Sequence, residues 1–227
     1  MAALVELYTS EGCDSCPPAD RWLSSLGSRG YTTAQVVPIA LHVDYWDYIG
    51  WKDPFAKAAF SARQRKLAQV QRARVVYTPQ VMLQGEDFRA WGSAEFDRAV
   101  ARINATPAVA RIALGLDTRK NDAFRVEVQA ELRVASAGTD AQLYLAAYEN
   151  KLMSAVASGE NRGKTLSHDF VVVEWIGPLA FDRDGRLAER RVLPLLPKAV
   201  PGHSGVAAFV QSRSTAKVLQ ALILPAC

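Results

Sequence analysis

The sequence predicts two structural units: an α/β domain over residues 1–106 and an all-β, immunoglobulin-like sandwich over residues 107–227. Short apolar runs alternate with helical segments up to about residue 105. From Phe124 to Val134 apolar and polar residues then alternate strictly, which is typical of a strand with one wet face. Ala105-Thr106-Pro107 separates the two patterns, so we place the boundary near residues 106–110.

The first strand and helix follow from the opening residues. Residues 4–8 are a short apolar run that ends in polar turn residues, as expected for a buried strand. An amphipathic helix is expected next, because apolar residues recur at helical spacing at Ala19, Trp22, Leu23 and Leu26. Gly27 is suited to end it. Residues 36–43 form the second expected strand, followed by an aromatic, turn-rich stretch.

The rest of this half alternates in the same way. Residues 55–73 are expected to form a long helix, and residues 75–77 and 81–83 a strand interrupted by Thr78-Pro79. Residues 88–91 are a candidate fourth strand. Ser93 is a suitable N-cap for a closing helix.

The second half contains strand candidates separated by turn clusters. Besides the alternating segment, they are residues 111–116, 142–148, 167–175, 188–195, 206–211 and 218–224. About seven short strands in this length favour a β-sandwich.

Composition excludes several classes of function. Of 227 residues, 49% are hydrophobic and 22% charged, with a net charge of +4, as in an ordinary globular protein. The densest basic stretch, residues 63–74, also carries Leu67 and Val70 and is expected to be a helix with a solvated basic face. Because no aromatic platform or groove-reading motif accompanies it, we expect no nucleic-acid partner. No segment is apolar enough for a membrane span.

The run from Tyr8 to Cys16 ends the first strand and opens the first helix, and it contains a C-x-x-C pair. A thiolate at a helix N-terminus is stabilised by free backbone N–H groups, which lowers the thiol pKa from about 8.5 toward roughly 7. Cys13 is then the expected nucleophile, and Cys16 the thiol that resolves a mixed disulfide. Pro17-Pro18 move the expected helix start to about residue 17, and Asp14 opposes activation of Cys13 by like-charge repulsion.

A second feature supports this interpretation. Thr78-Pro79 interrupts an apparent strand, where proline is unfavourable unless it has a special geometry such as a cis peptide bond.

These motifs resemble those of the thioredoxin and glutaredoxin superfamily. A longer set resembles a narrower, secreted bacterial family, a domain of unknown function with a thioredoxin-like fold. It comprises residues 6–13 and 16–20, the segments 42–48 and 50–55, and Tyr77-Thr78-Pro79-Gln80. The resemblance implies a thioredoxin-like first domain and a periplasmic or secreted protein. No signal peptide precedes residue 4, so a cytoplasmic location is the alternative.

Aromatic residues crowd the segment after the second strand, which is expected to lie near the dithiol. Tyr45, Trp46 and Trp51, together with Thr78 and Pro79, are the expected substrate-binding residues. The alternative is that these aromatic rings pack the insertion onto the body of the protein.

The three histidines form no zinc motif, and we expect no cofactor and no metal. One alternative remains, because Cys13, Cys16 and His42 together would suit Cu(I). His42 is otherwise a buried, hydrogen-bonded histidine or a residue with a redox role, and His168 is expected to be structural. Cys227 is left over at the C-terminus.

The sequence therefore predicts a thiol–disulfide oxidoreductase that exchanges with a thiol or disulfide of a protein or small molecule. Two alternatives from other classes stay open: a soft-metal chaperone, and a non-catalytic binding protein with a relic dithiol.

Overall fold

The computed structural model describes residues 1–120, 123–134, 140–197 and 199–226. Cys227 lies outside the described residues. The strands are β1 (Ala3–Thr9), β2 (Val36–His42), β3 (Gln80–Leu83), β4 (Glu86–Asp87), β5 (Ala110–Lys120), β6 (Ala123–Leu132), β7 (Ala141–Glu149), β8 (Leu152–Ala155), β9 (Thr165–His168), β10 (Val171–Ala180), β11 (Arg186–Pro194), β12 (Ser204–Ser212) and β13 (Val218–Pro225). The helices are α1 (Pro17–Ser24), α2 (Ala58–Val70) and α3 (Ala94–Ala105), with 3-10 turns η1 (Asp44–Ile49) and η3 (Pro201–His203).

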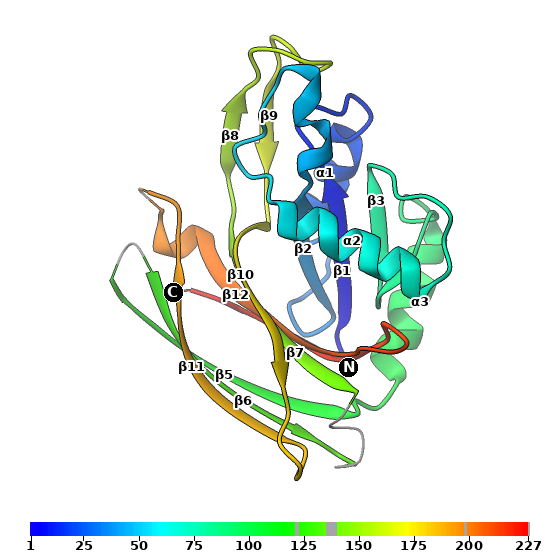
Figure 1. The fold of residues 1–227 in the computed structure, drawn as a ribbon, viewed down its shortest axis with the longest axis vertical. Helices are drawn as coiled ribbons and strands as arrows, with labels where there is room; N and C mark the ends of the chain where they lie inside the picture. Colours follow the sequence, from blue (N-terminus) through cyan, green and yellow to red (C-terminus); the bar gives the residue numbers. More distant parts are fainter. Residues whose placement is uncertain (121–122, 135–139, 198, 227) are drawn as a thin grey trace.

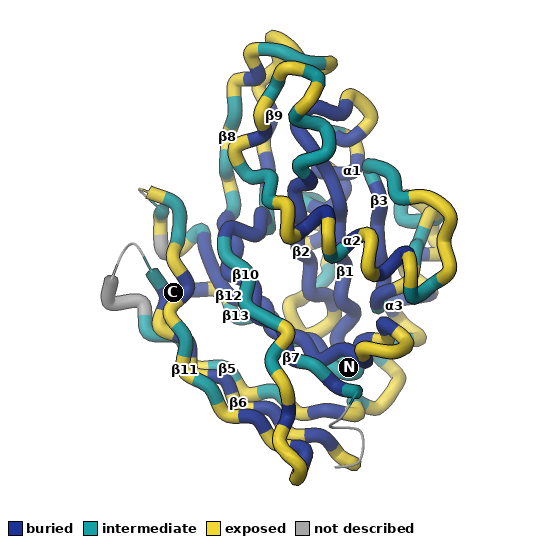
Figure 2. Tube along the Cα trace, in the orientation of Figure 1, coloured by how far each residue is buried: buried dark blue, intermediate teal, exposed yellow. Residues whose placement is uncertain are grey.

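One large mixed sheet runs through the molecule in the order β13-β12-β7-β10-β2-β1-β3-β4. In the first half, β1 is parallel to β2 and antiparallel to β3. Both β1 and β2 are buried along their whole length, which explains why they are apolar without alternation (Figure 2).

The second half adds a separate three-stranded sheet, β11-β6-β5 (Figure 1). In β6 every second residue is buried, as its alternating sequence predicts. The buried face of β6 belongs to an apolar cluster with residues of β7, β10 and β12, so two sheets pack face to face here.

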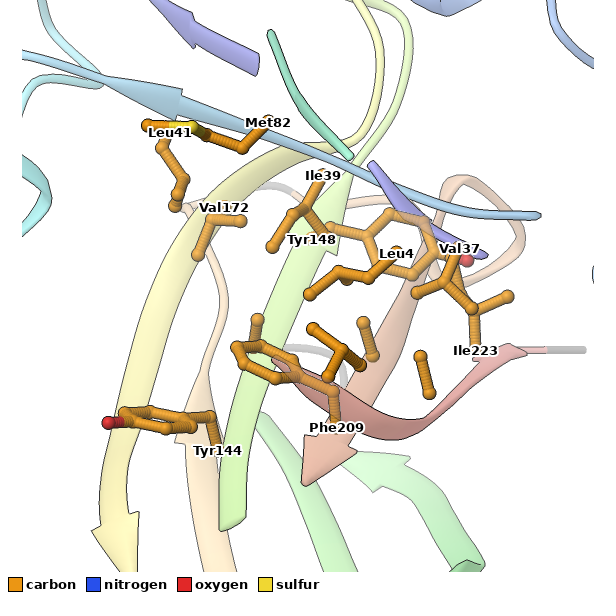
Figure 3. Close-up of a cluster of buried hydrophobic side chains, with 14 of the residues drawn as sticks. Leu4, Val37, Ile39, Leu41, Met82, Tyr144, Tyr148, Val172, Phe209 and Ile223 are labelled. Atoms are coloured by element: carbon orange, nitrogen blue, oxygen red, sulfur yellow. The ribbon is translucent and has the colours of Figure 1, made fainter. Parts of the chain in front are cut away.

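The large sheet crosses from one half to the other. Val171 of β10 pairs with Ala40 of β2, and the Ala40 N–H donates to the Phe170 carbonyl at 2.8 Å. A single apolar cluster joins Leu4 and Val37 of the first half to Phe209 and Ile223 of the second (Figure 3).

Three predicted strands differ, and two helices are shorter than predicted, because α1 ends at Ser24 rather than at Gly27 and α2 spans residues 58–70. Residues 75–77 are not a strand, because Pro79 has no N–H for a ladder and pairing begins at Gln80. Residues 88–91 are not a strand either, because a turn leads directly into α3. The predicted strand 167–175 is divided between β9 and β10 at Phe170, whose φ of +57° interrupts an extended backbone.

Candidate functional site

Cys13 and Cys16 are joined by a disulfide at the point where β1 leads into α1. Helix α1 begins at Pro17 with Cys16 as its N-cap, as the two prolines predict. Neither cysteine has any solvent-exposed surface. The disulfide therefore lies inside the protein.

An aspartate lies one helical turn beyond Cys16. The Asp20 N–H donates to the Cys16 carbonyl at 3.1 Å, and residues four apart share one helix face. The Asp20 carboxylate is buried and accepts a hydrogen bond from the Thr9 hydroxyl at 3.2 Å. Burial raises the pKa of Asp20, although the nearby His168 and His42 act to lower it.

A buried histidine–aspartate pair comes from β2 and the loop before α2. His42 Nδ1 lies 2.7 Å from an Asp53 carboxylate oxygen, and neither side chain is exposed. Burial alone would lower the pKa of His42, but the carboxylates of Asp53, Asp20 and Glu11 outweigh it and the pKa is raised. Burial would raise the pKa of Asp53, yet His42 and two backbone N–H donors lower it.

A second such pair joins the two halves of the chain. His168 Nε2 of β9 lies 3.1 Å from a carboxylate oxygen of Glu11, two residues before Cys13. The other oxygen of Glu11 accepts from the Trp51 indole N–H at 2.8 Å. His168 and Glu11 are both buried.

The two histidine rings meet edge to face, with their centroids 5.0 Å apart. His42 Nε2 and His168 Nδ1 are buried and make no hydrogen bond in the described part of the chain. Five ionisable side chains thus converge beside the disulfide: Glu11, Asp20, His42, Asp53 and His168. Buried polar nitrogens without partners are uncommon in folded proteins and are a feature of functional sites.

The loop before β3 reaches the same region. The Thr78–Pro79 peptide bond is cis. The Thr78 hydroxyl accepts from the Trp46 indole N–H at 2.7 Å. A Cβ on Gly12, beside Cys13, would lie 3.2 Å from Trp46 Cβ, so Trp46 contacts both loops. Tyr45 is half-buried and packs against the apolar core.

The loop between β8 and β9 contacts the disulfide loop directly. The Asn161 amide donates to the carbonyls of Glu11 and Cys13 at 2.8 and 2.9 Å. The Asp14 N–H donates to a Glu160 carboxylate oxygen at 3.1 Å. In Figure 1 this hairpin stands beside α1, away from the β5–β6–β11 sheet.

Among the residues that the sequence singled out, Cys13 is bonded to Cys16, Trp46 donates a hydrogen bond to Thr78, and Trp51 donates one to Glu11, two residues before Cys13. Sequence reasoning assigned no role at the site to Asn161, or to Glu11, Asp20 and Asp53, although the last three lie within the motifs that carry the family resemblance. It gave His168 only a structural place. Among the described residues, no three His, Cys, Asp or Glu side chains are placed to hold a metal ion. No helix of that part of the chain is long and apolar enough to cross a membrane.

Fold and site define a mixed α/β protein whose buried C-x-x-C disulfide is enclosed by polar groups from both halves of the chain. This chain belongs to the family described as "Protein of unknown function (DUF1223)", whose sequence profile matches residues 4–211. No curated protein matches its sequence.

Two solved structures are similar over almost the whole chain. A crystal structure of a protein from Agrobacterium tumefaciens is 25% identical, with a TM-score of 0.70, and the alignment covers 99% of this chain and 95% of that one. HBP35 of Porphyromonas gingivalis is 15% identical, with a TM-score of 0.74, over 99% of this chain and 75% of that chain. The second likeness is one of fold alone.

Proposed function

We propose that this protein is a thiol–disulfide oxidoreductase with a thioredoxin-like first half, acting through Cys13 and Cys16. The observation that carries the proposal is the disulfide itself, between the end of a central strand and the start of a helix and beside buried ionisable groups. Supporting it are the parallel β1–β2 pair and the antiparallel β3.

The reaction is an exchange of one disulfide for another. A substrate thiolate attacks Cys13 Sγ, the Cys13–Cys16 bond breaks, and its electron pair goes to Cys16 Sγ. A second substrate thiol then attacks the mixed disulfide, leaving the substrate oxidised and Cys13 reduced. Asp20, whose pKa burial raises, lies on the helix face of Cys16 and is our candidate for the group that supplies the proton to the Cys16 thiolate.

Attack requires access, and both cysteines are buried. Trp46 contacts the Gly12 backbone and bonds to Thr78, so η1 lies between the disulfide loop and the loop of Pro79. We propose that η1 moves to admit the substrate, whose extended segment then lies against Thr78 and Pro79, with Tyr45, Trp46 and Trp51 at the rim. We also propose that the protein works outside the cytoplasm, where disulfides persist.

The first test is the reduction potential of the Cys13–Cys16 couple, measured in thiol buffers with mass-spectrometric quantification. We expect a reversible couple between about −120 and −270 mV, the span of exchange catalysts. A couple below roughly −300 mV, as in structural disulfides, contradicts the proposal.

The order of attack is tested in a Cys227→Ser background, which removes the remaining cysteine. Cys16→Ser should accumulate a mixed disulfide on Cys13, because the resolving thiol is missing. Cys13→Ser should form none. Trapping on Cys16 instead would reverse the assignment.

A further inference from the structure

One peptide group of the disulfide loop is hydrogen-bonded on both sides by Glu160 and Asn161, two consecutive residues of the loop between β8 and β9, here called the hairpin loop. The Cys13–Asp14 peptide presents its carbonyl to the Asn161 amide at 2.9 Å and its N–H to the Glu160 carboxylate at 3.1 Å. The second bond of Asn161, to the Glu11 carbonyl at 2.8 Å, fixes the chain just before the loop. The hairpin loop thus holds the backbone around Cys13, the proposed nucleophile, through three hydrogen bonds.

The orientation of Asn161 is itself fixed. Its side chain is fully buried, and its Oδ1 accepts from Lys164 Nζ at 2.9 Å. Because lysine can only donate, the amide oxygen must face Lys164, and the NH2 group must face the two carbonyls.

The hairpin loop is also seated against η1. A Cβ on Gly159, whose φ is +77°, would lie 3.2 Å from Ile49 Cδ1, and a Cβ on Gly12 would lie equally close to the same atom. Ile49 is therefore packed between the hairpin loop and the disulfide loop, and the Ser158 hydroxyl bonds to the Gly50 carbonyl.

We propose, on the basis of the proposed function, that Glu160 and Asn161 are positioning residues that bind the disulfide form of the loop and thereby set its redox equilibrium. In the oxidised form the bond holds the two Cα atoms 5.4 Å apart, and the Cys13–Asp14 peptide fits the hairpin. Reduction removes that constraint, so the contacts favour the disulfide over the dithiol. Glu160 acts in the same direction, because its negative charge disfavours a thiolate on Cys13.

The experiment equilibrates the full chain with reduced and oxidised glutathione and measures the dithiol fraction after acid quenching. Two glutathione thiols form one glutathione disulfide, while their two electrons and two protons convert the Cys13–Cys16 bond into two thiols. We expect Asn161→Ala to shift the equilibrium about tenfold toward the dithiol, roughly 30 mV. Glu160→Ala should shift it in the same direction. Glu160→Gln, which retains an acceptor, should recover most of the wild-type value.

A matched control is Asn104→Ala. Asn104 also donates from its side-chain amide to two backbone carbonyls, those of Met1 and Gln35, at the far end of the first half. It should lower thermal stability without moving the redox equilibrium.

The proposal is overturned if Asn161→Ala and Glu160→Ala stay within twofold of the wild type, or if Asn104→Ala moves the equilibrium equally. If Asn161→Ala fails to fold, the redox equilibria of Glu160→Ala and Glu160→Gln decide the test, because Glu160 is exposed. A wild-type disulfide that does not equilibrate with glutathione would overturn the proposed function, whatever the variants show.

Discussion

At the scale of single residues, the site contains buried ionisable side chains, and the folded protein would be more stable with apolar or neutral side chains in their place. Asp20 has almost no exposed surface, and its side-chain hydrogen bond comes from the Thr9 hydroxyl. Burial raises its pKa above the ordinary value. Because the folded state resists ionisation of this group, Asp20 opposes folding at neutral pH.

We therefore expect Asp20→Asn to stabilise the oxidised protein at pH 8 by about 0.5–2 kcal/mol. A raised carboxyl pKa contributes stability below the unfolded value of about 3.9 and loses it as pH rises through the folded pKa. The advantage of Asp20→Asn should thus shrink in acid, and urea unfolding at several pH values measures it. Exchange by this variant should be slower, since Cys16 loses its proton donor.

The exposed Asp184 provides the control, because Asp184→Asn should change stability little at any pH. A loss of stability in Asp20→Asn at pH 8 would show that its carboxylate is ionised and paired with His42 or His168.

Much of this site was beyond sequence reasoning. Cys13, Cys16 and Pro79 form local motifs and could be found directly. Asn161 and His168 follow the dithiol by about 150 residues, and nothing local distinguishes them from turn and strand residues. They reach Glu11 only because the hairpin of β8 and β9 returns to the start of the chain. Only the tertiary fold supplies that proximity.

At the scale of elements, local signals predicted most helices and strands to within a few residues of their observed bounds. Helix α3 begins directly after its predicted N-cap, Ser93, whose hydroxyl accepts a hydrogen bond from the Glu95 N–H at 3.2 Å. The elements that differed depend on partners far along the chain. Residues 75–77 have strand composition but no strand beside them, and β8 and β9 are four-residue strands that pair only with each other in the described residues.

The cap gives a prediction for α3. Ser93→Ala should destabilise the protein by about 1 kcal/mol, because the first-turn N–H loses its acceptor. Ser93→Asp should restore stability, since aspartate is an equally good N-cap. Chemical denaturation of the three proteins measures this, and an unchanged Ser93→Ala would mean that water replaces the hydroxyl.

At the scale of the whole molecule, the two halves share one sheet, and the buried side chain of Arg63 contacts both halves. Arg63 of α2 bonds to Glu6 of β1 at 2.6 Å and to Gln211 of β12 at 3.0 Å. Its guanidinium also lies about 5 Å from the ring centres of Tyr144, Trp175 and Phe209, all from the second half. This single side chain connects the strand that leads to the dithiol with the strands of the second half.

Arg63→Ala should therefore lower the free energy of unfolding by about 3–5 kcal/mol, because it leaves the fully buried Glu6 carboxylate without its cation. Since Arg63 contacts residues of both halves, we expect one cooperative transition at a lower temperature rather than the loss of one half. Tryptophan fluorescence can follow the two halves separately in variants with a single tryptophan, either Trp22 of α1 or Trp175 of β10, in which the other four are replaced.

Arg65→Ala, two residues further along the same helix, is the control for Arg63→Ala. Its guanidinium lies 5.9 Å from the Tyr45 ring and is exposed, so Arg65→Ala should change stability by less than about 1 kcal/mol.

If Trp22 and Trp175 instead report separate transitions in Arg63→Ala, the halves fold independently. When the second half unfolds, we would then expect the disulfide loop to keep its contacts with the first half. It would lose its hydrogen bonds to Glu160 and Asn161. The redox equilibrium measured above the melting point of the second half would move toward the dithiol, and this shift would place the control of the dithiol in the second half.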